Sequence, residues 1–462
     1  MARPERHITR RDLLRFTGTG IAVATGSWAL AACGGGNAGV TADEAAGPRV
    51  NPTTLTDAEK QTLLKMAGPI DAAHSGQGMT WKLGAAFPFT GPYGYYQTIE
   101  GDGLRLAAQH IPQLGGPTID FDFQNFGGAN GIDTQKAVDA VLQIHDTAAG
   151  AMVSGIGGAM GAVIPGAGRY QILCLDGGAG VGQFANKPYY WAMRNQYPVD
   201  NVGVICEYVK KAMPNARSAT LLYITGPSND PITAAMSDKV KASGVELAGT
   251  SLKPLGTTDW SDTFTAIKSQ NPDIVLAMIN GNDAAYFMKQ YVTTGLTQPV
   301  FGSSYSQPQA KIAGNGFENK YYFCQEDFLP DQPSNDWGAI FAKYYRQAFP
   351  DQPTAPSSPM NLSANYYNLT FVLWALARRV LAKGGDINKG DQLQEALTSD
   401  PTFPSIFGGS GSTPGSMQFA MDGVNGHGLE HSPLGIFQVR DGALVRIASS
   451  DSKGGQMTIT SA

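Results

Sequence analysis

The stretch WKLGAAFPFTGPYGYYQTIEGDGLRLAAQHI, residues 81–111, decides the fold class. Residues 81–87 form an apolar strand-like run, residues 88–95 form a loop of Gly, Pro and Tyr, and residues 96–111 repeat apolar side chains with a helical period. The same strand–loop–helix unit recurs along the chain. Such alternation is typical of parallel sheets that carry helices on both faces, so the sequence predicts an α/β protein.

The repeated units predict two open sheets. The expected strands are residues 81–87, 118–123, 151–154, 172–175, 219–224, 245–250, 273–279 and 299–302. The expected helices between them are residues 96–111, 132–146, 160–169, 200–213, 232–243, 261–270 and 283–295. Eight strands could close into a barrel, but the interruption at residues 185–199 divides them into four plus four. Two doubly wound sheets fit this division better.

The two ends of the chain carry different signals. Residues 55–67 predict a short peripheral helix, in which Thr56 and Glu59 have the spacing of a capping box. The late chain predicts three longer helices and two strand-like runs, with a turn at Asp441-Gly442, and these are expected to cover both sheets (residues 334–349, 361–383, 389–398, 417–419 and 435–439).

Composition excludes several classes of protein. Of 462 residues, 42% are apolar and 15% are charged, which excludes a disordered chain. The net charge of −5, without a long basic run, argues against nucleic acid as a partner. Glycine reaches 57 residues, about 12% against the usual ~7%, and has no collagen-like period. These glycines are expected in turns and in sites lined by backbone.

Residues 1–32 have the order of an export signal. Five arginines, including the adjacent Arg10 and Arg11, precede a weakly apolar stretch that ends in Leu-Ala-Ala before Cys33. The arginine pair resembles a twin-arginine signal, and the last four residues resemble a bacterial lipobox, in which Cys33 becomes the lipid attachment point. The alternative is a frayed basic N-terminus of a cytosolic protein.

Removal of the export signal would change the net charge of the chain. Without residues 1–32 the 33 basic and 38 acidic residues become 28 and 36, a net charge of −8. Residues 33–79 are then a lipidated tether followed by the peripheral helix. No further apolar run of 18 residues follows. We therefore expect an extracytoplasmic protein, anchored to the outer face of the cell membrane through its N-terminal lipid.

The loops that follow the strands predict the ligand site. In open α/β sheets ligands bind at the carboxyl ends of the strands, where helix N-termini offer free backbone N–H groups. Glycine allows close approach, and tyrosine supplies a flat wall with a polar tip. A single loop of this kind is more often an ordinary turn. Six such loops on the corresponding edges of two sheets indicate a ligand cleft.

Several stretches, in this order, resemble the type I solute-binding proteins of branched-chain-amino-acid ABC importers, the Leu/Ile/Val-binding group. The resemblance covers about residues 80–448. It rests on Phe89-Thr90-Gly91-Pro92-Tyr93 followed by Gly103–Ala107, on Phe121–Gln124 followed by Asp133–Val138, on Val153–Pro165, on Asp259–Phe264 followed by Asn271–Val275, and on Phe419–Gly423 with Phe437–Gly442.

This resemblance implies two α/β lobes joined by three chain crossings, a Venus flytrap. Lobe 1 is expected at residues 80–197 plus 326–414, and lobe 2 at residues 198–325 plus 415–450. Members of the group close on a small ligand and deliver it to a permease, which implies a monomeric binding protein without catalysis, cofactor or metal.

The loops after the strands, together with this resemblance, predict the ligand contacts: Thr90, Tyr93, Tyr96, Gly157, Gly158, Gly178, Ala179, Ser228, Asn229, Asn280, Asn282, Ser304 and Tyr305. Two departures stand out. The hydroxyl-rich loop that grips an amino-acid carboxylate is replaced by Asp176-Gly177-Gly178-Ala179-Gly180, and the tyrosine of the second lobe falls at Ser228-Asn229. An amino acid, an amide or an aromatic acid remains open as ligand.

Other functions find less support in the residues. His427 and His431, with Glu430 between them, have metal-like spacing, but the surrounding Gly and Pro favour a loop. Cys174, Cys206 and Cys324 are expected to be small buried residues, although a disulfide remains open after export. No GxSxG elbow or P-loop occurs. The alternatives are a sensor domain of the same fold and an exported hydrolase.

Overall fold

The computed structural model describes most of the chain from residue 50 onward. The described ranges are 50–68, 71–90, 94–128, 131–155, 160–178, 182–194, 198–225, 230–254, 256–279, 281–303, 305–351, 358–423, 426–450 and 457–460. The export signal and Cys33 lie outside these ranges. No helix in the described ranges is long and apolar enough to cross a membrane.

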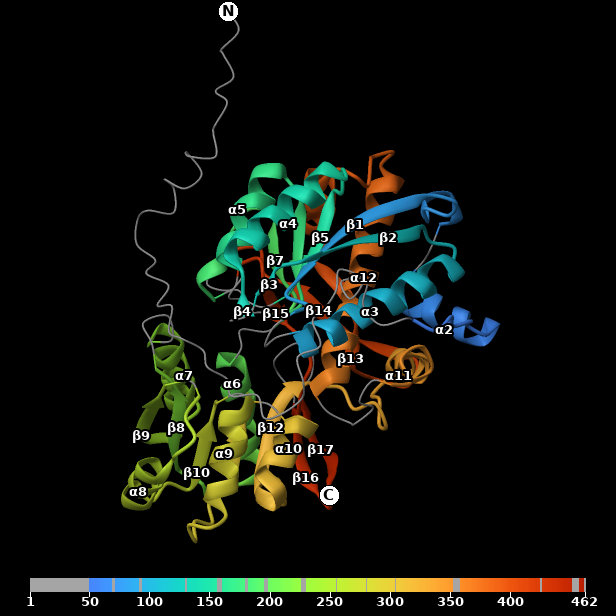
Figure 1. Ribbon diagram of the computed structural model, residues 1–462. Helices are drawn as coiled ribbons and strands as arrows, with labels where there is room; N and C mark the ends of the chain where they lie inside the picture. The colour runs from blue at the N-terminus through green and yellow to red at the C-terminus, as the bar shows by residue number, and fades with distance from the viewer. Residues whose placement is uncertain are drawn as a thin grey trace, which may run out of the picture. The chain divides into compact units, whose positions relative to one another are not determined.

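The first sheet has five parallel strands in the order β2-β1-β5-β6-β7. The strands are β1 (Thr80–Phe87), β2 (Thr118–Asn125), β5 (Ala151–Ser154), β6 (Leu173–Asp176) and β7 (Tyr190–Ala192). One face packs against α3 (Gly94–Gln113) and α12 (Ser358–Ala382), and the other packs against α4 (Thr134–Asp146) and α5 (Met160–Tyr170) (Figure 1). This is a doubly wound sheet, as the sequence predicts.

The second sheet has eight strands in the order β18-β17-β16-β12-β11-β10-β8-β9. A parallel block consists of β8 (Ser218–Ile224), β9 (Glu246–Lys253), β10 (Ile274–Ala277), β11 (Val300–Gly302) and β12 (Tyr321–Glu326). An antiparallel edge follows, made of β16 (Leu434–Arg440), β17 (Ala443–Ser450) and β18 (Met457–Ile459).

Helices cover both faces of the second sheet. On one face lie α6 (Val199–Ala212) and α7 (Asp230–Ala242), and on the other lie α8 (Ser261–Gln270), α9 (Gly281–Tyr291) and α10 (Gln307–Ala313). The predicted α/β class with two doubly wound lobes is therefore confirmed. Of the two strand-like runs expected in the late chain, the run at residues 435–439 lies in this antiparallel edge, as part of β16.

A third, small sheet corrects one predicted boundary. It pairs β13 (Thr402–Ser410), β14 (Thr413–Phe419) and β15 (Leu429–His431). The side chains of Phe403, Met417 and Leu429 are buried in the core of the first lobe. Strands β14 and β15, which lie largely in the range 415–450 expected for lobe 2, thus belong with lobe 1, because their apolar side chains pack there. The sequence analysis also does not predict two short strands of two residues each, β3 (Gly127–Gly128) and β4 (Gly131–Ile132).

The chain passes between the lobes three times, between β7 and α6, at residues 327–335 and at residues 432–433. After the second crossing, α11 (Asp336–Ala348), α12 and α13 (Gly390–Ser399) return to the first lobe. After the third crossing, β16 pairs with β12 and forms a hairpin with β17. The predicted turn of this hairpin contains Asp441 and Gly442, which both have positive φ (50° and 74°). Both residue types tolerate this conformation, which suits a tight hairpin.

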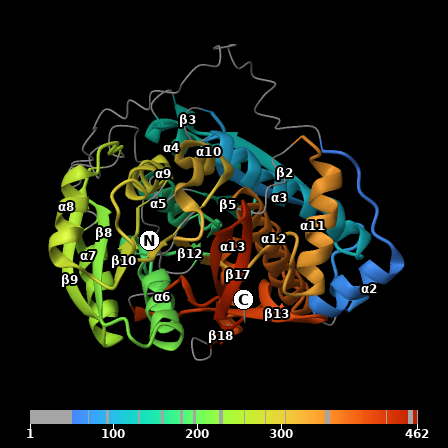
Figure 2. The same cartoon turned by 90° about the horizontal axis from the view of Figure 1, so that it is seen from below.

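Residues 50–67 form a strap across the first lobe, and α2 (Asp57–Met66) is its helix. The predicted capping box is present: Thr56 accepts from the Glu59 N–H, and Glu59 accepts from the Thr56 N–H. The side chains of Leu55, Leu63 and Met66 are buried in the first core. Figure 2 shows α2 beside α11.

Candidate functional site

The described ranges contain four of the thirteen predicted ligand contacts with their side chains. Tyr96 lies in α3, but its side chain is outside the description. The others outside the described residues are Tyr93, Gly157, Gly158, Ala179, Ser228, Asn229, Asn280 and Ser304. These eight, and Tyr96, stay predictions.

Thr90 and Gly178 lie at the carboxyl edge of the first sheet, as expected. Thr90 follows β1 and accepts a hydrogen bond from Asn125 at the end of β2 (3.1 Å). Gly178 follows β6, and its N–H donates to Asp176 Oδ1 (2.8 Å). Both loops are therefore held by the ends of their own sheet.

The two second-lobe residues differ from each other. Asn282 is exposed in the first turn of α9, which follows β10. The Tyr305 ring is buried, stacks on Phe323 (5.6 Å, 19°) and meets Phe317 edge-on. It also borders a cavity of about 360 Å³ beside Lys311 and Gly442. Its described contacts are those of a core residue.

Gly177 explains one departure from the family pattern. A Cβ at this position would lie 2.7 Å from Cζ of Tyr366, a fully buried residue of α12. The Tyr366 hydroxyl donates to the Ser154 carbonyl at the end of β5 (3.2 Å). Burial raises the pKa of Tyr366, and the nearby Glu100 and Asp176 carboxylates raise it further. Glycine is thus required at residue 177 because a tyrosine fills the space below it.

Asp176 is fully buried beneath this loop. Its Oδ2 accepts from the Tyr190 hydroxyl (2.9 Å), and its Oδ1 accepts from the Gly178 N–H. Burial raises the pKa of Tyr190, and the Asp176 carboxylate adds to this. The loop after β6 is therefore shaped by hydrogen bonds within the lobe.

Helix α12 supplies a second set of contacts. Asn365 Nδ2 donates to the carbonyls of Gly177 (2.8 Å) and Met193 (3.3 Å). One turn earlier, Asn361 Nδ2 donates to Glu326 Oε2 (2.9 Å). Arg194 Nε donates to the other oxygen of Glu326 (2.7 Å). A polar network thus joins the predicted ligand loop to the first and second crossings.

The sequence analysis missed Glu100, Arg194, Glu326, Asn361, Asn365 and Tyr366. A signal was present in α12, whose apolar sequence is interrupted by polar residues that the structure buries: Asn361, Ser363, Asn365, Asn368 and Thr370. Polar side chains in a buried helix need partners, so they mark places where the helix meets loops or other polar groups.

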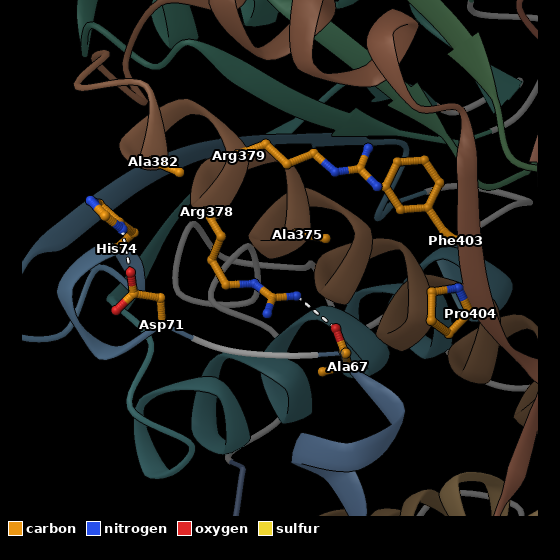
Figure 3. Close-up of a pocket in the computed structure, with 10 residues that line it drawn as sticks. Ala67, Asp71, His74, Ala375, Arg378, Arg379, Ala382, Phe403 and Pro404 are labelled. Carbon is orange, nitrogen blue, oxygen red and sulfur yellow. Dashed lines mark hydrogen bonds and ion pairs between the residues drawn. The ribbon is translucent and has the colours of Figure 1, made fainter.

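A separate cavity of about 410 Å³ lies at the opposite end of the first lobe, between α2, α12 and β13. Figure 3 shows Arg378 directed at the end of α2, where it donates to the Ala67 carbonyl (2.7 Å). Arg379 donates to the carbonyl and carboxylate of Asp400, and His74 lies 2.7 Å from Asp71. The two arginines therefore hold the end of α2 and the residue that follows α13.

The remaining candidates behave as buried or packed residues. Cys174, Cys206 and Cys324 are buried free thiols, which confirms the first expectation for them. Burial raises the pKa of all three. His427 stacks on Trp191 (4.1 Å) and its Nδ1 lies 2.9 Å from the Lys187 carbonyl, while the His431 side chain is outside the description.

Comparison with known proteins identifies the family. Residues 80–442 match the model of the periplasmic binding protein family. The chain belongs to the periplasmic binding protein family. This match starts at β1 and leaves out the strap. Among curated proteins, none matches the sequence.

Solved structures share the periplasmic binding protein fold. An ABC transporter substrate-binding protein from Sphaerobacter thermophilus is 16% identical, with a TM-score of 0.66 over 81% of this chain and 98% of its own. A solute-binding protein from R. palustris in complex with benzoate is 17% identical (TM-score 0.63; 81% and 97% covered). A branched-chain amino acid binding protein from Streptococcus pneumoniae in complex with isoleucine is 18% identical (TM-score 0.61; 79% and 99% covered).

Proposed function

We propose that this chain is the solute-binding protein of an ABC importer. It captures a small polar ligand between its lobes, without chemistry, and delivers it to a permease. The observation that carries this proposal is the family match over residues 80–442, on a chain that crosses three times between two sheets. Ligand contacts on both lobes would favour the closed form over the open one.

The ligand class follows from the charges at the first lobe. Two buried acids, Glu100 and Asp176, lie near Tyr366, whereas a third, Glu326, is paired with Arg194. Buried carboxylates oppose a second carboxylate and favour hydrogen-bond donors. We therefore expect a ligand that presents an ammonium, amide or hydroxyl group to this edge, in contrast to a simple acid such as the benzoate in the R. palustris complex.

A thermal-shift screen with matched pairs tests both statements. Each pair shares an apolar body and differs in its polar group: benzoate with benzamide, and 3-methylpentanoate with isoleucine. A ligand at 100 times its Kd adds about 2.7 kcal/mol to the free energy of unfolding. Stabilisation by the donor-bearing member supports the proposed class. Equal stabilisation by the plain acid contradicts the class but retains the binding function.

The predicted loops supply the proposed ligand contacts, with Tyr96 in the first turn of α3 as the leading one. Tyr96→Ala should weaken binding at least about tenfold, because a tyrosine wall is lost, and should leave folding unchanged. Isothermal calorimetry with the ligand from the screen measures this. An unchanged Kd would remove Tyr96 from the site.

The lipid anchor and the export route belong to the same proposal. The charge pattern of residues 1–32 and the Leu-Ala-Ala-Cys string support processing at Cys33. Mass spectrometry of the protein expressed in its native membrane should find an N-terminal diacylated Cys33. Cys33→Ala should release the chain from the membrane fraction, and a membrane-bound variant would contradict the anchor.

A further inference from the structure

Arg194 touches the ligand loop and the hinge at once. It follows β7, at the start of the first crossing. Its Nη1 lies 3.4 Å from the Gly178 carbonyl, and its Nε donates to Glu326 Oε1 at 2.7 Å. Both side chains of this ion pair are largely buried, with exposed fractions of 18% and 10%. A charge-assisted bond in such surroundings is stronger than one in water.

Glu326 is the last residue of β12, so it moves with the second sheet. Its other oxygen accepts from Asn361 of α12, a residue of the first lobe. The same helix holds the Gly177 carbonyl through Asn365. Rotation of one lobe against the other turns the backbone at the crossings, and therefore displaces Glu326 relative to Arg194 and Asn361.

We propose that Arg194 is a positioning residue that couples the ligand loop at Gly177-Gly178 to the hinge through Glu326. The proposal rests on the proposed function, which makes this loop part of the ligand site. A loop held in one conformation keeps Arg194 oriented toward Glu326, and an intact ion pair in turn keeps the loop ordered. Such coupling is reciprocal and is measurable from either end.

The chain contains a matched control in the next residue. Asp327 Oδ1 accepts from Arg446 Nε, also at 2.7 Å, and this pair is somewhat more buried (13% and 2% exposed). However, Arg446 makes its second bond to the Gln332 carbonyl (2.9 Å), away from the ligand loop. The two adjacent acids therefore differ in whether their arginine reaches Gly178.

Hydrogen–deuterium exchange of the ligand-free full chain tests the coupling. In the native chain the Gly177 and Gly178 N–H groups are bonded to the Ser154 carbonyl and to Asp176. Glu326→Gln, which does not touch the loop, should make their exchange about two- to tenfold faster, the range expected when roughly one hydrogen bond is weakened. Asp327→Asn should leave the loop unchanged and alter exchange around residues 327–332 and 443–450, where Asp327 and Arg446 make their contacts.

Two outcomes would overturn the proposal: loop exchange that is unchanged in Glu326→Gln, or loop exchange that Asp327→Asn accelerates equally. Arg194→Lys is a second variant, because lysine keeps the charge but lacks the two-armed reach of arginine. This variant should also accelerate hydrogen exchange at Gly177 and Gly178, and unchanged exchange there would again overturn the coupling. Since no ligand is added, the result is independent of the ligand screen, and a negative result leaves the binding function standing.

Discussion

The two lobes have the same architecture but different carboxyl edges. In the first lobe, side chains from several elements meet there: Asp176 and Tyr190 from the sheet, Arg194 from a crossing, and Asn365 and Tyr366 from α12. In the described part of the second lobe, the buried acids Glu326 and Asp327 lie at the end of β12 and face the crossings. A third buried acid, Asp283, accepts from the Gly256 N–H, and Asn282 beside it is exposed. The second lobe instead concentrates aromatic rings in its core.

This contrast indicates that the first lobe is the one whose side of the site is organised before a ligand binds. Groups already bonded to one another lose little further freedom when a ligand arrives. We therefore expect the first lobe to orient the ligand, and the second lobe to close over it. The strap adds to the rigidity of the first lobe, because it joins α2 to α3 and α11 through buried side chains and polar bonds.

The largest expected effect comes from a cavity made between the strap and the core of the first lobe. Leu63→Ala removes a side chain that is 1% exposed in the first core, and should lower the free energy of unfolding by about 2–5 kcal/mol. Denaturant unfolding measures the loss, and exchange should rise in the first lobe before the second. Leu64→Ala, at a half-buried neighbour, is the control. A loss below about 1 kcal/mol at residue 63 would show that the strap is dispensable.

The second largest effect is expected from acid, which should protonate His110 and weaken its contact with the strap. Burial lowers the pKa of His110 to about 4, despite the attraction of Glu59, and its ring lies 3.3 Å from the Thr53 hydroxyl. An unfolded histidine has a pKa near 6.5, so the unfolded chain binds more protons between these values. The stabilising contribution of neutral His110 is therefore complete above about pH 6.5. As the pH drops to 4, the free energy of unfolding falls by about 3 kcal/mol. His110→Gln should flatten this part of the curve of stability against pH.

Glu59 continues the loss at lower pH. Burial alone would raise the pKa of its carboxyl group, but hydrogen bonds from Lys343, Tyr344 and Thr56 outweigh burial and bring the pKa to about 2. Stability from these bonds is present above pH 4.5 and is lost as the pH falls toward 2. Glu59→Gln should remove this second step in acid titrations followed by circular dichroism.

An intermediate effect is expected at the ligand loop. Gly177→Ala places a methyl group against Tyr366 and should cost about 1–3 kcal/mol, with altered ligand affinity. Gly203→Ala in α6 is the second-lobe control. A Cβ there has Lys239 Cδ as its nearest neighbour at 3.7 Å, so alanine should be neutral or stabilise by up to about 1 kcal/mol. Equal effects at both positions would contradict the contrast between the lobes.

The smallest effect concerns Asp283. Burial raises the pKa of its carboxyl group, against hydrogen bonds from the Gly256 and Thr257 N–H groups. The fold therefore favours the protonated form, and this acid lowers stability as the pH rises above its ordinary value of 3.8. Asp283→Asn should stabilise the chain at pH 7 by less than about 1 kcal/mol, with no gain at pH 3. Thermal unfolding at both pH values measures this.

Local patterns predicted most of the secondary structure. The runs at 81–87, 151–154 and 219–224 become β1, β5 and β8 with shifts of at most one residue at either end. The capping box at Thr56 and the Asp441-Gly442 turn also form as predicted. These features depend on residues that are close in sequence, so the chain alone reveals them.

The sequence by itself determined the class of fold, the family and the loops where a ligand is expected. Only the tertiary structure decided that β14 and β15 pack with the first lobe, that Gly177 makes room for Tyr366, and that Arg194 joins the loop to Glu326. The reason is physical. Periodicity records which face of an element is apolar, whereas the partners of a buried polar group can lie far away in the chain, as Glu326 does from Arg194 (132 residues) and Asn365 from Gly177 (188 residues).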